Sequence, residues 1–141
     1  MRRRIQANWT GPLSAKAPEA MQLATLMVLT PDLDEAQRFY QDILGLDIIS
    51  RDADVLVLDH SGIAFHVFQC ERSAPGTLHG QVAGTIAVFG VSSIEEAMAR
   101  LRAQGVVFLH EMPATNRFGR YATFKAPGGN VHELFEPFAT S

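Results

Sequence analysis

The chain has 141 residues, of which 47% are apolar, and its formal net charge is −3 with a pI near 5.9. This length and apolar content fit one compact domain with a real core and exclude a disordered chain. The weakly acidic balance does not predict a nucleic-acid partner, and no apolar run approaches the ~18 residues that a membrane span needs. The single cysteine, Cys70, excludes an internal disulfide and fits a reducing, cytoplasmic location.

Residues 1–21 read as an extension that precedes the domain. They begin with three arginines after Met1 and hold Trp9 and two prolines, but they lack the apolar stretch of a secretory signal. We interpret this segment as flexible or loosely docked, with a weak targeting peptide as the alternative, and expect the domain itself at residues 22–137.

The most informative feature is an internal repeat, in which residues 24–49 and 85–109 each read as a strand, a capped helix and a glycine stop. Asp32 predicts a helix N-cap with Glu35 three residues later, and Ser93 and Glu96 repeat this arrangement 61 residues on. Behind each cap, apolar residues recur at i, i+3, i+4 and i+7, which predicts one buried stripe per helix. The stripes are Ala36, Phe39, Tyr40 and Ile43, then Ile94, Ala97, Met98 and Leu101, and glycines end the helices at Gly45 and Gly105.

Three β-rich runs follow each helix. The first set is 46–50, 54–60 and 63–69, with a turn at 60–62, and the second is 106–111, 120–126 and 130–136, with a turn at 127–129. The fold class is therefore α+β, with two βαβββ halves at 22–70 and 83–137 and a linker at 71–82. Each sheet has one face covered by a helix, and we expect the other faces to form a curved cleft, where small molecules usually bind.

The segments "DLDEAQRFYQDILGL" and "GGNVHELFEP", inside this duplicated frame, resemble the vicinal oxygen chelate superfamily, which contains glyoxalase I, extradiol dioxygenases, fosfomycin resistance enzymes and bleomycin-binding proteins. The resemblance covers roughly residues 22 to 137. It implies the fold much more specifically than the reaction, because this scaffold serves many activities. It also implies a homodimer, because members of the superfamily often pair halves across subunits.

In metal-using members of the superfamily, ligands project into the cleft from matching strand positions of the two halves. The resemblance places Thr25 and Ile86 at one pair of these positions and His66 and Glu133 at the other. A catalytic zinc needs three protein ligands, and the non-haem iron triad needs two histidines and a carboxylate. Isoleucine has no donor and threonine is a weak one, so no metal cofactor is favoured and dioxygenase chemistry is disfavoured.

A divalent metal held by His66 and Glu133 stays open as an alternative, with His79, His110 or a second subunit supplying the third ligand. Without a metal, His66 and Glu133 are candidates for a mutual hydrogen bond, for binding a polar group or for catalytic proton transfer. His132 cannot share the cleft with its neighbour Glu133, because successive side chains of a strand alternate, and we expect it on the helix side or at an edge, with Leu134. The HExxH zinc motif is also absent, since position 136 is glutamate.

The expected ligand-binding residues line a mostly apolar cleft. They are Thr25, Met27, Leu29, His66, Phe68, Ile86, Val88, Glu133 and Phe135, with Arg117, Arg120 and Tyr121 near the rim. The resulting hypothesis is a protein of the glyoxalase and bleomycin-resistance type that binds a small, partly apolar molecule without a complete metal site. The alternatives are a metal-dependent lyase or isomerase resembling glyoxalase I, and a scaffold whose filled cleft serves protein interaction.

Overall fold

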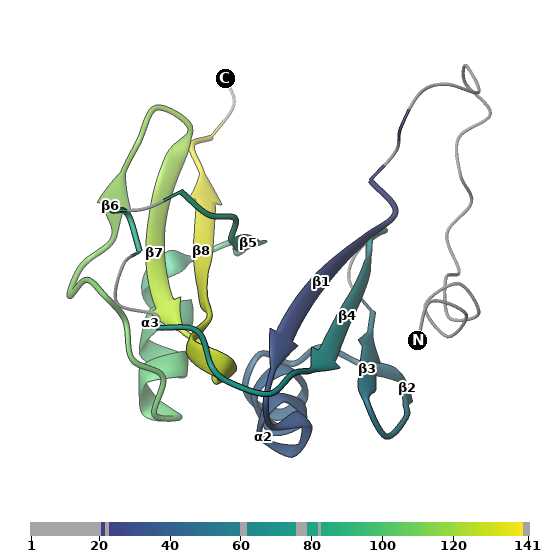
Figure 1. Cartoon of the computed structure of the whole chain (residues 1–141). Helices are drawn as coiled ribbons and strands as arrows, with labels where there is room; N and C mark the ends of the chain where they lie inside the picture. The colour runs from purple at the N-terminus through teal and green to yellow at the C-terminus, as the bar shows by residue number, and fades with distance from the viewer. Residues whose placement is uncertain (1–20, 22, 60–61, 76–78, 82, 140–141) are drawn as a thin grey trace. The chain divides into compact units, whose positions relative to one another are not determined.

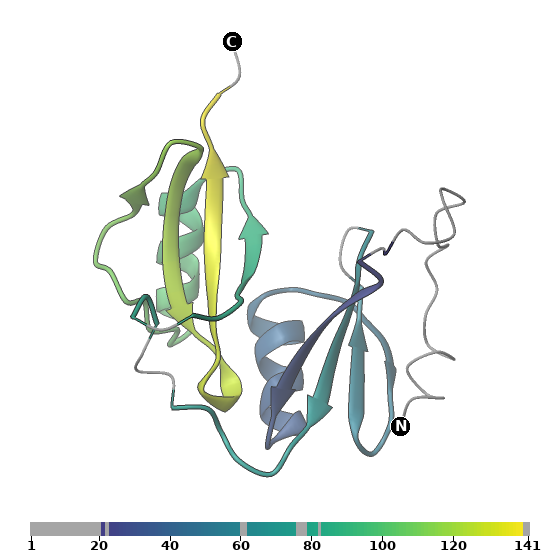
Figure 2. The ribbon, with the colours of Figure 1, turned by 45° about the horizontal axis from the view of Figure 1, so that its top comes forward.

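A computed structural model describes residues 21, 23–59, 62–75, 79–81 and 83–139. The chain divides after Glu71 into two compact units, each of which is built around one four-stranded sheet (Figures 1 and 2). The expected extension at 1–20, part of the turn at 60–61 and positions 76–78 and 82 of the expected linker lie outside the described residues.

The first unit runs through β1 (Thr25–Thr30), α2 (Leu33–Gln37) with the π-helical segment η1 (Arg38–Ile43), β2 (Ile48–Arg51), β3 (Val55–Leu58) and β4 (Ala64–Gln69). Its strand order is β1-β4-β3-β2. β1 is parallel to β4, and the other neighbours are antiparallel. The helix packs on β3 and β4, so one face of the sheet is covered from within the unit.

The second unit repeats this plan with β5 (Ala87–Gly90), α3 (Ile94–Ala103), β6 (Ala114–Thr115), β7 (Gly119–Lys125), the 3-10 turn η2 (Pro127–Gly129) and β8 (Val131–Pro137). Its order is β5-β8-β7-β6, again with one parallel pair, β5 and β8. The two βαβββ modules that the sequence predicts are therefore confirmed.

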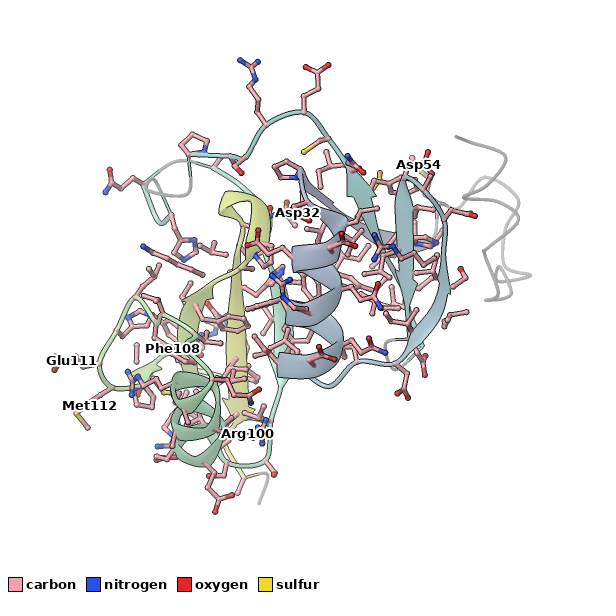
Figure 3. The ribbon with its side chains drawn as sticks, turned by 90° about the horizontal axis from the view of Figure 1, so that it is seen from below. Asp32, Asp54, Arg100, Phe108, Glu111 and Met112 are labelled. Carbon is pink, nitrogen blue, oxygen red and sulfur yellow. The ribbon has the colours of Figure 1, made fainter. Side chains whose placement is uncertain are left out.

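The helix boundaries follow the expected capping chemistry. The Asp32 side chain accepts from the backbone N–H groups of Asp34 and Glu35, and Ser93 accepts from the N–H of Glu96, so both predicted N-caps form (Figure 3 labels Asp32 at the start of α2). Gly45 and Gly105 have φ of 81° and 90°, the left-handed conformation that ends a helix without strain in glycine. None of the helices in the described ranges is long and apolar enough to cross a membrane.

The buried stripes also form, with one local difference. Ala36, Phe39 and Tyr40 are buried as predicted, whereas Ile43 is half-exposed. The cause is the π-helical geometry of η1, in which the N–H of Leu44 donates to the carbonyl of Phe39, five residues back. This wider turn rotates later side chains away from the 3.6-residue register on which the prediction rested.

The strand expected at 106–111 is wrong in position, because the named edge strand of the second unit is β6 at Ala114–Thr115. Val107 and Leu109 do exchange backbone hydrogen bonds with β7, but within 106–111 only Phe108 forms an isolated bridge. The ladder stops because the Arg102 guanidinium takes the carbonyls of His110 and Glu111, and because Pro113 has no N–H to donate.

Candidate functional site

The open face of the first sheet, opposite α2, carries the residues that the sequence assigned to the ligand. In the parallel ladder Met27 pairs with His66 and Leu29 pairs with Phe68, and alternation adds Thr25 to the same face. The apolar side chains of β1 are left open, with Met27 51% and Leu29 50% exposed. An apolar surface therefore borders one polar residue, His66.

His66 is fully buried, at 0% exposure, and is held by a defined hydrogen-bond chain. Its Nδ1 lies 2.5 Å from the Oγ1 of Thr25, and that hydroxyl donates to the carbonyl of Ala64 at 2.9 Å. Burial lowers the pKa of the His66 imidazole and so favours the neutral ring. Within the described part of the chain, its Nε2 is buried without a hydrogen-bond partner.

The surroundings of His66 are apolar. The Phe68 ring stacks with the imidazole at 6.2 Å between centroids and an interplanar angle of 21°, and Phe68 clusters with Val55 and Val57 of the neighbouring strand. A polar atom without a partner in such surroundings is costly, by about 1–3 kcal/mol, unless a bound group satisfies it.

The open face of the second sheet places Glu133 where the first sheet has His66. Glu133 pairs with Val88 of β5 and Thr123 of β7, and Phe135 pairs with Tyr121. Val88 is 46% exposed, so this face also combines an open apolar side chain with one acidic group.

Burial raises the pKa of the Glu133 carboxyl, and the neighbouring His79, the hydroxyl of Thr123 and His110 act against this shift. Thr123 donates to the Oε2 of Glu133 at 3.5 Å, a weak bond, and is itself buried. The His110 ring meets the ring of Tyr121 edge-on at 5.9 Å. Thr123 was missed from the sequence, although its alternation with Tyr121 on the same strand was a signal that could have found it.

His132 lies on the opposite face of β8, as strand alternation predicted. It is 2% exposed and packs between the rings of Phe89 and Phe124. Desolvation in these surroundings lowers its pKa to about 4. His132 is therefore part of the helix-side core and does not share a face with Glu133.

A cavity of about 460 Å³ lies at the start of β8 in the second unit, partly lined by Ile86, His79 and Asn130. The segment of the expected linker that borders it is tied to the turn before β8, because the N–H of Ala74 donates to the carbonyl of Gly128 at 2.8 Å. Ile86 precedes β5, half-exposed, and contributes an apolar wall to this cavity.

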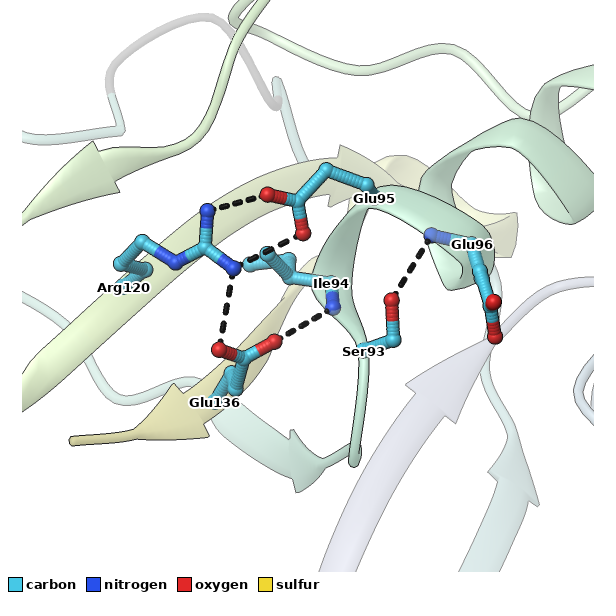
Figure 4. A network of polar contacts seen from close by, with 6 residues as sticks. All are labelled: Ser93, Ile94, Glu95, Glu96, Arg120 and Glu136. Carbon is cyan, nitrogen blue, oxygen red and sulfur yellow. Dashed lines mark hydrogen bonds and ion pairs between the residues drawn. The ribbon is translucent and has the colours of Figure 1, made fainter. Parts of the chain in front are cut away.

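The two arginines expected near the rim lie in different surroundings. Arg120 lies on the helix side of β7 and forms ion pairs with Glu95 and Glu136, and Glu136 also accepts from the N–H of Ile94 (Figure 4). This network lowers the pKa of both carboxyls through their hydrogen bonds and leaves Arg120 engaged within its own unit. Arg117 is exposed and stacks its guanidinium over Phe118 at 5.1 Å.

The four matching positions do not supply a three-ligand metal set. Ile86 has no donor atom, and the Thr25 hydroxyl is already engaged by His66 and Ala64. Within either unit, the described residues bring together no group of three or more His, Cys, Asp or Glu side chains that could hold a metal ion. The donor set thus falls short of the catalytic zinc and facial-triad patterns.

Solved structures share this architecture. TnmS3, an antibiotic-binding protein from Streptomyces sp. CB03234, superposes with a TM-score of 0.63 at 22% identity, covering 86% of this chain and 99% of its own. The fosfomycin resistance protein FosX of Listeria monocytogenes, seen with Mn(II) and sulfate, gives 0.67 at 19% identity over 84% and 91%. A glyoxalase family protein from Enterococcus faecalis gives 0.68 at 21% identity over 82% and 97%.

A search of curated proteins gave no significant match. The sequence model of the Glyoxalase/Bleomycin resistance protein/Dioxygenase superfamily, in contrast, matches residues 22–134, which is most of the chain. Together with the duplicated βαβββ sheets and their strand order, this match shows that the chain belongs to the glyoxalase/bleomycin resistance/dioxygenase superfamily, that is, the vicinal oxygen chelate superfamily.

Proposed function

We propose that this protein binds a small, partly apolar molecule on the open faces of its sheets and does so without a complete metal site. The observation that carries the proposal is that Met27, Leu29 and Val88 are about half exposed on the same faces as His66 and Glu133. Apolar surfaces with a few placed polar groups are typical of small-molecule sites. The antibiotic-binding function of TnmS3 is consistent with this use of the scaffold.

Binding of hydrophobic aromatic probes tests the proposal directly. We expect 2-naphthol to bind saturably with one site per chain, measured by fluorescence and calorimetry. Leu29→Glu should weaken binding at least ~10-fold, because it places a charge on the apolar face. Ile49→Glu, the same change at an aliphatic residue of the same unit with the same 50% exposure, is the matched control and should leave the affinity unchanged. Absence of saturable binding by the wild type would overturn the proposal.

Metal independence is tested separately, by elemental analysis of the purified protein and by calorimetric titration of Zn²⁺, Ni²⁺, Mn²⁺ and Fe²⁺. We expect no stoichiometric metal, and no difference between the wild type and Glu133→Ala. Micromolar or tighter binding that Glu133→Ala loses would replace this part of the proposal with a metal site.

The proposal includes a homodimer in the cytoplasm. The resemblance to the superfamily supports the dimer, and the single cysteine supports a reducing location. Light scattering coupled to gel filtration should give twice the 15.5 kDa chain mass, and cell fractionation should recover the protein with the cytoplasmic markers. A mass of one chain across the micromolar range would remove the dimer from the proposal.

A second candidate function is a lyase or isomerase that uses Glu133 for proton transfer. The specific observation in its favour is the raised pKa of the Glu133 carboxyl, next to Thr123 and near His79 and His110, since a proton-transfer group needs a pKa shifted toward the working pH. Turnover of a glutathione hemithioacetal, with and without added divalent metal, discriminates the two functions. Turnover that Glu133→Gln abolishes would favour the enzyme.

A further inference from the structure

The Thr25 hydroxyl can satisfy its two neighbours in only one proton arrangement. It has one proton, and its oxygen lies 2.9 Å from the carbonyl oxygen of Ala64 and 2.5 Å from the Nδ1 of His66, with the carbonyl oxygen of Leu26 more distant at 3.5 Å. A carbonyl oxygen can only accept, so the hydroxyl proton belongs between Thr25 and Ala64. The bond to His66 must then be donated by the ring, from Nδ1–H to Oγ1.

The opposite arrangement leaves two acceptors in contact. If the hydroxyl donated to Nδ1, its oxygen would face the Ala64 carbonyl at 2.9 Å with no proton between them. That geometry loses one hydrogen bond and brings two oxygen lone pairs together. The chain of contacts therefore fixes the neutral tautomer of His66 with its proton on Nδ1, and the ring nitrogen that remains, Nε2, carries a lone pair.

We infer that Thr25 makes His66 Nε2 an acceptor-only group, and that the ligand of this face is an uncharged hydrogen-bond donor, a phenol or alcohol, on a flat apolar body. This inference rests on the proposed small-molecule function and names the ligand class for it. Nε2 is buried and has no partner among the described residues, so a donor from the ligand satisfies an atom that is otherwise left unpaired.

The apolar residues around Nε2 indicate what the part of the ligand that carries the donor group should be. Phe68 stacks with the imidazole, and Val55 and Val57 lie beside it, so an aromatic or aliphatic ring is the complementary body. Met27 is the cross-strand neighbour of His66 and is half exposed, and we expect its flexible side chain to move aside when the ligand reaches the ring. A carboxylate has no proton to donate at neutral pH, so its oxygens would face the same lone pair without a hydrogen bond.

Thr25 thus acts as a positioning residue, through His66. A threonine at this strand position turns the histidine that it touches into a hydrogen-bond acceptor of fixed orientation. Thr30, at the other end of β1 and on the helix-side face, offers a matched control, because it is buried to the same degree as His66 but does not contact it.

The first test is the tautomer of His66, read by long-range ¹H–¹⁵N NMR correlations of the imidazole in the ligand-free protein. We expect the proton on Nδ1 in the wild type, in Thr25→Ser and in Thr30→Val, and a shift toward the Nε2–H tautomer in Thr25→Val. Thermal unfolding of each variant confirms that it is folded. A wild-type ring protonated on Nε2 would overturn the inference whatever the protein binds.

The second test compares 2-naphthol with 2-methoxynaphthalene, which has the same body but no proton to donate. We expect the wild type, Thr25→Ser and Thr30→Val to prefer 2-naphthol by roughly 10-fold, about the worth of one hydrogen bond, and Thr25→Val to lose this preference. Equal affinity of the wild type for both probes would overturn the inference while the binding function stands. Failure of the wild type to bind either probe would overturn the proposed function itself, together with the ligand class drawn from it.

Discussion

The two halves of the molecule share one framework but carry different chemistry at matching positions. Both have the same strand order, an N-capped helix and a parallel pair that brings the first strand beside the last. On the open face, however, the first half has Thr25 and His66 where the second has Ile86 and Glu133. The residues that build the repeat are thus alike in the two halves, whereas the open-face residues at these positions differ.

Burial acts on the two polar residues in the same chemical direction. It lowers the pKa of His66 and raises the pKa of Glu133, and each shift favours the uncharged form. Each residue also has a threonine hydroxyl as its hydrogen-bond partner, Thr25 in one half and Thr123 in the other. Under the proposed function, we therefore expect both faces to bind a neutral, partly apolar molecule better than a strongly charged one.

The largest expected effect compares two glycines that match in the repeat, Gly62 and Gly129. Both have positive φ, 99° and 75°, so alanine is strained at either place. A Cβ at Gly62 would meet nothing within 4 Å, but at Gly129 it would lie 2.0 Å from the carbonyl oxygen of Ala74. We expect Gly62→Ala to lower the free energy of unfolding by ~1 kcal/mol and Gly129→Ala by ~3 kcal/mol or more.

Denaturant unfolding of both variants measures this difference. Because the backbone strain is similar, the excess for Gly129→Ala isolates its contact with the segment at Ala74. Equal losses would show that this segment does not pack on the turn in solution.

The next effect concerns matching core positions that hold Phe65 in one half and His132 in the other. Both are almost fully buried, and the pKa of His132 is lowered from 6.5 to about 4. The unfolded chain therefore binds a proton that the folded chain does not bind, as pH falls from about 6.5 to about 4. Above pH 6.5 the His132 imidazole is neutral in both states and does not lower the free energy of unfolding. Protonation of the unfolded chain should lower this free energy by about 3 kcal/mol by pH 4.

Reciprocal substitutions test this origin of the acid sensitivity. His132→Phe should weaken the dependence of unfolding free energy on pH between 6.5 and 4, and Phe65→His should steepen it by adding a buried imidazole to those of His66 and His132. Unfolding midpoints across this pH range measure both. An unchanged slope in His132→Phe would assign the acid sensitivity to other groups.

The repeat explains how much could be predicted from the sequence. Caps, helix stripes, glycine stops and the alternation that separates His132 from Glu133 are local patterns, and the structure agrees with them. The exceptions depend on partners distant in sequence or on local geometry that periodicity does not encode. The π-helical turn leaves Ile43 half-exposed. Arg102 donates to the carbonyls that would have extended the strand at 106–111. Glu95 and Glu136 form ion pairs with Arg120 on the helix side. The Thr25–His66 bond likewise depended on a strand register that only the folded sheet reveals.

The smallest expected effect compares the arginines that tie a sheet to its helix in each half. Arg51 donates to Asp34 and Gln37 of α2, whereas Arg120 pairs with two carboxylates, Glu95 and Glu136.

Because Glu136 also accepts from the N–H of Ile94, loss of Arg120 leaves this capping carboxylate without its counter-charge. We therefore expect Arg120→Met to lower the thermal midpoint by a few degrees and Arg51→Met to lower it less. The difference between the thermal midpoints of the two variants should become smaller in ~1 M NaCl, where the Debye length falls to about 3 Å and partly exposed ion pairs are screened. A gap that persists unchanged in high salt would mean that Arg120 acts through packing of its aliphatic stem, and the two halves would then differ in shape complementarity and not in charge.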